Sequence, residues 1–296
     1  MRTVSMIAAL VLSGAGAAVH AEDRTFEKRV AADAHGMVEV SNVAGVVNVI
    51  GWDRPEVEVQ ADLEEGVERV DVSTEGGRTL VKVVLPRDSR RNEDADADVN
   101  VRVPRSSELT LVTVSADVDV KQVLGAQRLK TVSGSVNTQV AGANAEINSV
   151  SGDIQVTGSA TPATQRFNTV SGNVTLEHGA GDVEATSVSG DVQVEVAPAR
   201  SVRLRSTSGD LSFHGKLARD GSLDAETMSG DVTLDAGGGY EYEASSFSGE
   251  IEGCFGKDAE HAGAHAPGSR LNGKLGDGSA RVRARTMSGD VSLCGE

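Results

Sequence analysis

Acidic side chains recur at one place in a short motif, and they are the residues best placed to do chemistry. The motif reads hydroxyl, apolar, Ser, Gly, acidic or polar, apolar, as in SVSGDIQV from Ser149 and SVSGDVQV from Ser187. The residue after the glycine is acidic in most copies, as at Asp153, Asp191, Asp210, Asp231, Glu250 and Asp290. Such a row of carboxylates could bind calcium or supply the acid and base of a hydrolase.

A structural role for these carboxylates is the stronger interpretation, because aspartate in a turn bonds nearby backbone amides. The calcium-binding nonapeptide G-G-x-G-x-D does not occur in the sequence. Asp94, Asp96 and Asp98 begin like an EF-hand loop, but Val99 stands where that loop needs glycine. We therefore assign no metal-binding, cofactor-binding or catalytic residue, and we expect no cofactor.

The histidines and the lack of known catalytic motifs also argue against a metal site or an active site. His261 and His265 share a Gly- and His-rich stretch, and two histidines alone make a weak metal site. The sequence contains no G-x-S-x-G, H-E-x-x-H or P-loop motif. One enzymatic alternative remains, a carbohydrate-active β-solenoid with acids among the motif aspartates. Aromatic residues, which form sugar-binding platforms, are only 3% of the chain, so a non-enzyme is favoured.

The motif glycine sets the fold, and we call it the pivot of each repeat. The pivots are Gly134, Gly152, Gly172, Gly190, Gly209, Gly230, Gly249 and Gly289. They lie 18 to 21 residues apart except for a last gap of 40 residues. This period is too short for a βαβ unit, which needs about 30 residues, and fits one coil of a β-solenoid. We predict an all-β, single-chain, right-handed parallel β-solenoid, with the handedness taken from the rule for parallel crossovers.

Apolar residues alternate with polar ones on both sides of each pivot, which predicts two half-buried strands per coil. Around Gly190 the predicted inward residues are Val183, Ala185, Val188, Val192 and Val194, and Met228 has the place of Val188 in the coil of Gly230. The hydroxyl row that includes Ser187 lies next to the corner. We predict that it turns inward, which argues against an ice-binding surface.

Charged residues six and four positions before each pivot are predicted to face outward, and their sign alternates from coil to coil. Arg203 and Arg205, for example, are followed by Asp224 and Glu226. Opposite charges would then meet on neighbouring strands and favour the correct register. One exception stands out, because these two acidic residues are followed by a further acid, Glu243.

The two cysteines occupy equivalent places, each five residues after a pivot. If the 40-residue gap is one coil plus an inserted loop at about 255–279, Cys254 and Cys294 stack on adjacent coils. The distance between neighbouring strands, about 4.8 Å, suits a disulfide. The alternative is two free thiols separated by a further coil near Leu271–Ser279.

The predicted domain organisation has three parts. Residues 1–21 resemble a signal peptide, with Arg2, an apolar stretch and a Val19-His20-Ala21 cleavage site. Residues 22–110 are β-rich but irregular, with Trp52 as the one large anchor, and we expect them to cap the solenoid. Residues 111–296 carry the coils. No later segment is long and apolar enough to span a bilayer.

The charge of the chain limits the class of partner. Among 296 residues there are 28 Lys and Arg against 44 Asp and Glu, so the formal charge is −16. Nucleic acid is therefore not expected as a partner.

The SGDV ladder, the GWDRPEVEV segment and the late LGDGSARVRARTMSGDVSL resemble the bacterial putative-adhesin β-strand-repeat family, a domain of unknown function. The resemblance covers the chain from about Thr25 onward and implies an exported β-solenoid without catalytic residues. We predict a non-enzymatic envelope or surface protein, periplasmic or extracellular. It would be adhesin-like or scaffolding, with an envelope protein or a glycan as partner. An envelope signalling accessory is a further alternative. A flat apolar or hydroxyl patch would favour binding, and an acidic groove with a raised carboxyl pKa would favour the enzyme.

Overall fold

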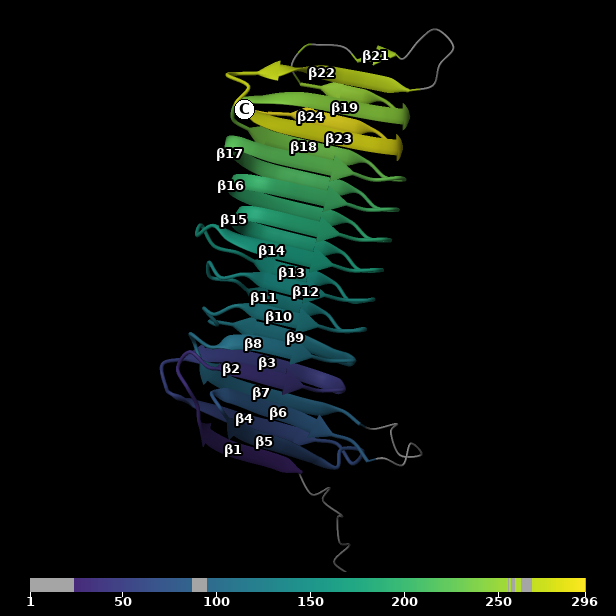
Figure 1. Cartoon of the computed structure of the whole chain (residues 1–296). Helices are drawn as coiled ribbons and strands as arrows, with labels where there is room; N and C mark the ends of the chain where they lie inside the picture. The colour runs from purple at the N-terminus through teal and green to yellow at the C-terminus, as the bar shows by residue number, and fades with distance from the viewer. Residues whose placement is uncertain (1–23, 87–94, 255, 257–258, 262–267, 296) are drawn as a thin grey trace, which may run out of the picture.

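A computed structural model describes residues 24–86, 95–254, 256, 259–261 and 268–295. Within these ranges the chain forms strands and no helix, and the strands join into one sheet that winds around a long axis (Figure 1). The predicted all-β solenoid is confirmed. The described part holds no helix long and apolar enough to cross a membrane. The expected signal peptide, Asp94 and His265 lie outside the described residues.

Each central coil has one strand before its pivot and one after it. The first strands are β8 (Glu108–Val112), β10 (Gln127–Lys130), β12 (Ala145–Asn148) and β14 (Ala163–Asn168), and the second strands are β9 (Ser115–Lys121), β11 (Val136–Gln139) and β13 (Ile154–Thr157). Each strand pairs in parallel with its counterpart one coil further on, so that Leu129 lies beside Ile147 and Ile147 beside Phe167. Further along, β15 (Val174–Thr186), β16 (Val192–Arg205) and β17 (Leu211–Glu226) each supply the second strand of one coil and the first strand of the next.

The core consists of apolar columns that run along the axis. One column places Phe167 between Ile147 and Ala185, so a large ring is followed by a small side chain. All three residues are fully buried. The predicted inward alternation is correct for Val183, Ala185, Val192 and Val194. It is wrong for Val188 and Met228, which are 43% and 53% exposed, because the chain turns a corner there.

At the N-terminal end, order along the sequence and order in space differ. The strands there are β1 (Thr25–Ala31), β2 (Met37–Ser41), β3 (Ala44–Trp52), β4 (Glu56–Leu63), β5 (Arg69–Glu75), β6 (Arg78–Val84) and β7 (Ala97–Pro104). The coil of β2 and β3 lies between the coil of β6 and β7 and that of β8 and β9. Antiparallel strands close this end, with β1 on β4, β4 on β7 and β5 on β6.

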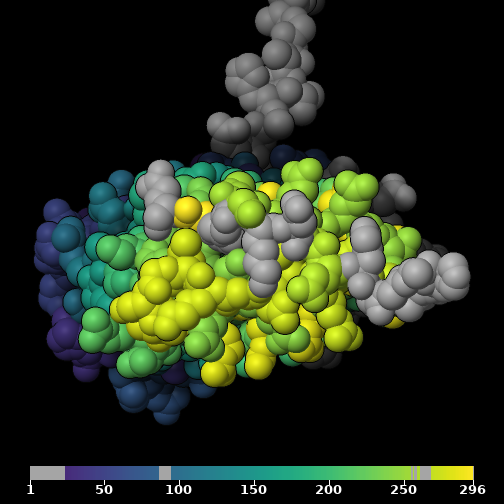
Figure 2. Space-filling model, turned by 90° about the horizontal axis from the view of Figure 1, so that it is seen from above, coloured from purple at the N-terminus to yellow at the C-terminus, as the bar shows by residue number. Residues whose placement is uncertain are grey.

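At the C-terminal end, too, the order of the coils along the sequence differs from their order in space. Its strands are β18 (Val232–Gly237), β19 (Tyr240–Ser248), β20 (Ile251–Gly253), β21 (Glu260–His261), β22 (Ser269–Leu275), β23 (Ala280–Ser288) and β24 (Val291–Cys294). The coil of β23 and β24 is inserted between the coil of β17 and β18 and that of β19 and β20. Antiparallel β22 then covers β19. The stretch 255–279, expected as a loop, therefore contains β21 and β22. In the view onto this end, the green and yellow atoms of the C-terminal part of the chain form most of the surface (Figure 2).

This insertion removes the exception in the predicted charge alternation. Arg283 on β23 lies between Asp224 on β17 and Glu243 on β19. Its guanidinium is 3.8 Å from the Asp224 carboxylate and 3.6 Å from the Glu243 carboxylate. In stacking order, the sign therefore alternates without exception from the coil of Gly134 to the coil of Gly249.

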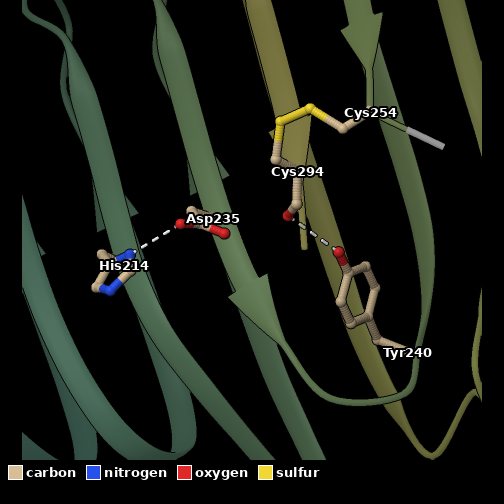
Figure 3. The surroundings of a disulfide bond; sticks show 5 residues. All are labelled: His214, Asp235, Tyr240, Cys254 and Cys294. Carbon is tan, nitrogen blue, oxygen red and sulfur yellow. Dashed lines mark hydrogen bonds and ion pairs between the residues drawn. A yellow bond between two sulfur atoms is a disulfide. The ribbon is translucent and has the colours of Figure 1, made fainter. Parts of the chain in front are cut away.

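A disulfide joins the ends of the two outermost coils. Cys254, just after β20, is bonded to Cys294 at the end of β24, with their Cα atoms 5.0 Å apart (Figure 3). The hydroxyl of Tyr240 donates a hydrogen bond to the carbonyl oxygen of Cys294 over 3.2 Å. Burial, with a smaller contribution from the charge of Asp235, raises the pKa of Tyr240 to about 12. Nearby, His214 Nδ1 lies 3.0 Å from Asp235 Oδ2 and links β17 to β18 (Figure 3).

Candidate binding surface

One corner of the solenoid carries an exposed row of apolar side chains, two positions before each pivot. We call this row the corner ridge; in stacking order it consists of Val114, Val132, Val150, Val170, Val188, Thr207, Met228, Met287 and Phe247. In the coil of β8 and β9, which contains Val114, Ala116 holds the place of the pivot glycine. Every apolar member is 43–57% exposed. A serine follows each member, and these serines are also exposed. The corner thus presents neighbouring apolar and hydroxyl rows along many coils.

The ridge faces outward because the positions on either side of it turn inward. The preceding hydroxyl residue, such as Ser187 or Thr227, is buried. In the coils from Ser187 onward its hydroxyl donates to the carbonyl of the neighbouring pivot, as from Thr227 Oγ1 to Gly209 O over 3.1 Å and from Ser246 Oγ to Gly289 O over 2.9 Å. The predicted inward hydroxyl ladder is therefore present. Two successive outward residues then follow, which breaks the alternation of a regular strand.

The pivot glycines allow the coils to approach closely at this corner. A Cβ added to Gly152 would lie 1.9 Å from the carbonyl oxygen of Gly134, and one added to Gly190 would lie 2.1 Å from that of Gly172. The other pivots are equally close to their neighbours, at 2.0–2.2 Å. Backbone hydrogen bonds, such as that from Ser151 N to Val132 O over 2.8 Å, also join adjacent corners. The corner ridge is thus held on a rigid base.

The motif carboxylates flank the ridge and act as backbone acceptors. Oδ1 of Asp191 accepts a hydrogen bond from the amide of Asp210 over 2.9 Å, and Oδ1 of Asp210 accepts one from the amide of Asp231 over 2.8 Å. Asp98 belongs to the same row, since it accepts from the amide of Val46 over 3.0 Å. Each carboxylate therefore bonds the next coil, where we had expected a bond within its own turn. Among the described residues, no group of three or more His, Cys, Asp or Glu side chains could hold a metal ion.

A shallow hollow of about 320 Å³ lies on the outer face near the C-terminal end. It forms beside Gly273, and Glu241, Glu243, Lys274 and Arg283 line it. Its acid Glu243 is paired with Arg283, as described above.

The described carboxyl groups with clearly shifted pKa values all shift downward. The guanidinium of Arg200 donates to Asp182 and lowers the pKa of that carboxyl group. Hydrogen bonds from Ser279 lower the pKa of Asp277. These shifts favour the charged form and suit structural ion pairs and turns.

A buried acid anchors the N-terminal end. The side chain of Glu58 is 1% exposed and accepts hydrogen bonds from Arg29 Nε over 2.8 Å and Arg102 Nη1 over 2.9 Å. Burial alone would raise the pKa of Glu58, but the hydrogen bonds and charges of the two guanidinium groups outweigh it, and the pKa is lowered. Trp52 packs beside them. Its indole donates to the Glu56 carbonyl over 2.8 Å, and the guanidinium of Arg102 lies 5.8 Å from its ring centre. Trp52 therefore serves as a structural anchor.

The sequence did not predict the corner ridge, because the residue two positions before each pivot was assigned to the inward-facing set. The signal was present in the sequence, since the apolar residues at this position lie directly between a hydroxyl residue and Ser-Gly.

Comparison with known proteins gives one family match. The family model described as Toastrack DUF4097 matches residues 58–294. No curated protein matches this chain.

Similar solved structures are distant. A putative adhesin from Bacteroides fragilis is 10% identical, with 91% of this chain and 96% of that chain covered and a TM-score of 0.43. A putative lipid binding protein from Parabacteroides distasonis is 12% identical, with 91% and 96% covered and a TM-score of 0.41. A putative adhesin from the same species is 11% identical, with 92% and 98% covered and a TM-score of 0.38.

Proposed function

Since the chain belongs to the Toastrack DUF4097 family, we propose that it is a non-enzymatic, adhesin-like or scaffolding protein whose corner ridge is the binding surface. The observation that carries this proposal is the row of half-exposed Val, Met and Phe side chains, which only Thr207 interrupts. Contiguous exposed apolar patches on a folded protein usually mark interaction sites. The rigid glycine corner supports the same function, because a fixed surface loses little conformational freedom on binding.

Export to the periplasm or the cell surface is part of this proposal. The apolar N-terminal stretch resembles a signal peptide. The disulfide between Cys254 and Cys294 fits an oxidising compartment. The partner would be an envelope protein or a glycan, and the apolar character of the ridge favours a protein. The charge of −16 argues against nucleic acid.

The test is a capture experiment with the mature chain and an extract of its own envelope. The ridge variant carries Val170→Asp and Val188→Asp. The control variant carries Gln155→Asp and Gln193→Asp, which add the same charge at exposed positions outside the ridge. We expect the wild type and the control to retain a specific partner, and the ridge variant to retain at least about tenfold less, since buried charges in an apolar contact are costly.

Equal retention by the ridge variant would show that the partner binds elsewhere. A glycan array treated with the wild type provides the check on the enzymatic alternative. Shortened glycans would overturn the non-enzymatic function and direct attention to the acidic residues.

A further inference from the structure

We propose that the occupant of the corner ridge is the corner ridge of a second copy of this chain, with the two solenoids side by side and parallel. In this arrangement each coil faces the same coil of the other copy. The inference rests on the proposed function, because it assigns a partner to the same binding surface. Three properties of the ridge support it, namely its repeat distance, its size and the charges on its two flanks.

The first property is the repeat distance. The ridge presents one side chain per coil, so its members are spaced by the distance between strands, about 4.8 Å. An α-helix repeats a facing stripe about every 5.4 Å and would be out of step by about 5 Å over the eight intervals of the ridge. An extended strand repeats each face about every 6.6 Å. A second copy has the same spacing and can stay in contact from Val114 to Phe247.

The second property is the size of the surface. Eight intervals of about 4.8 Å give a ridge about 38 Å long. The edge of two packed sheets with their side chains is about 15 Å wide, so about 550 Å² per copy would be covered. The total of about 1,100 Å² just exceeds the roughly 1,000 Å² expected of a specific interface. We therefore expect a weak dimer that forms as the protein concentration rises.

The largest side chains are grouped at one end of the ridge. Met228 and Phe247 are neighbours of Met287, because the coil of β23 and β24 is inserted between their two coils. They are the most exposed members, at 53%, 57% and 55%. Phe and Met are enriched at protein interfaces relative to the rest of the surface. The inserted coil thus builds the strongest part of the contact.

The third property is the charge on the flanks. One flank is the row just after the pivots, which is mostly acidic and consists of Asp117, Ser135, Asp153, Asn173, Asp191, Asp210, Asp231, Asp290 and Glu250. The other flank lies four residues before the pivots and is mixed, with Val112, Lys130, Asn148, Asn168, Thr186, Arg205, Glu226, Arg285 and Ser245. All of these residues are exposed or half-exposed.

These flanks select the parallel arrangement. An antiparallel dimer would place one acidic row against the other, which is repulsive. A parallel two-fold axis places the acidic row of one copy against the mixed row of the other. Asp210 then faces Arg205 of the second copy, and Asp290 faces Arg285 of the second copy. One contact between like charges remains, at the coil of Gly230, against these two favourable ones.

Site-directed cross-linking tests both the dimer and its direction. Ser115→Cys and Ser248→Cys place single thiols beside opposite ends of the ridge, and both native cysteines are in the disulfide. With a short bis-maleimide, we expect each variant to cross-link to itself. Differently tagged Ser115→Cys and Ser248→Cys chains should give no mixed product when combined. Mixed products without self-linking would show an antiparallel dimer and overturn the proposal.

Sedimentation equilibrium over a wide range of protein concentration tests the ridge itself. The wild type and the Gln155→Asp/Gln193→Asp control should associate, and the Val170→Asp/Val188→Asp variant should remain monomeric. Association of the ridge variant equal to the wild type, or a wild type monomeric at every concentration, overturns the dimer.

The capture experiment is scored separately on the same variants. If the wild type is monomeric but the ridge variant still loses its envelope partner, the dimer is wrong and the binding function stands. If the dimer forms through the ridge but capture is unaffected, the dimer stands and the assignment of the envelope partner to the ridge is wrong.

Discussion

Gly190→Ala is the substitution that most directly tests how the coils are stacked. Gly190 is a pivot in the middle of the solenoid, and its backbone is not among those with positive φ. The residue is therefore required for close approach alone. An added Cβ would lie 2.1 Å from the carbonyl oxygen of Gly172, and it would have to move about 1.3 Å to reach an ordinary contact of 3.4 Å.

The cost follows from the contacts at that corner. A shift of this size would break the hydrogen bonds from Ser189 N to Val170 O, at 2.8 Å, and from Asp191 N to Asn173 Oδ1, at 3.0 Å. Two lost hydrogen bonds cost about 2 kcal/mol, and overpacking costs about 1–3 kcal/mol. Replacing glycine by alanine also lowers the conformational entropy of the unfolded chain, which offsets up to about 1 kcal/mol of this cost. We expect the free energy of unfolding to fall by about 3 kcal/mol.

Gly237→Ala is the matched control, because a Cβ added at Gly237 lies no closer than 3.7 Å to its neighbours. We expect its stability to stay within about 1 kcal/mol of the wild type. Guanidinium unfolding is followed by far-ultraviolet circular dichroism for the whole sheet and by Trp52 fluorescence for the N-terminal end. If the Gly190 and Gly237 variants unfold at the same denaturant concentration, close approach does not explain the pivot glycines.

Three further predictions concern charge, pH and the disulfide. Arg283→Glu places like charges on three adjacent strands and should lower the free energy of unfolding by about 1 kcal/mol at low salt. Most of this loss should be recovered at high salt, because salt screens exposed charges. An equal loss at low and high salt would indicate that packing is the cause. The lowered pKa of Glu58 means that its stabilising effect is present above about pH 4.5 and is lost as pH falls through the lower folded-state pKa. Glu58→Gln should therefore flatten the acid limb of a stability profile measured by Trp52 fluorescence, and an unchanged limb would contradict this origin. Cys254→Ser removes a link across 40 residues to Cys294 and should lower the stability of the C-terminal end by about 4 kcal/mol, read by hydrogen exchange of β20 and β24.

The coil architecture could be predicted from the sequence because each coil repeats its own local rules. The pivot glycines, the inward hydroxyls such as Ser187 and the alternating valines all specify the same fold. Parallel pairing in a solenoid is mainly between neighbouring repeats, so a regular period is sufficient evidence for it.

The order of the coils at the ends could not be read from the period, because a coil can dock on either face of a stack. The alternation of charge held the missing information. Placing Arg283 between Asp224 and Glu243 was the arrangement that removed the exception, and the structure adopts it. Charge therefore specified an order that apolar periodicity left open.

The corner ridge could not be predicted by alternation, because two consecutive residues face outward there. Val188 and Ser189 are both exposed, so a rule of period two assigns one of them to the wrong side. A corner is recognisable only when the residues on both sides of it are considered together.

The inserted coils also determine when each end of the molecule can fold as the chain is made. Among the described residues, the strand pairings of β19 and β20 are all to β22, β23 or β24, so residues 240–253 gain strand partners only after these later strands have emerged. Residues 37–52 likewise wait for β6 to β9. Such non-local contacts slow folding. The middle coils can form one after another during synthesis or export. Residues 37–52 are complete in their strand partners once Lys121 has emerged, whereas residues 240–253 wait for the last strand of the chain.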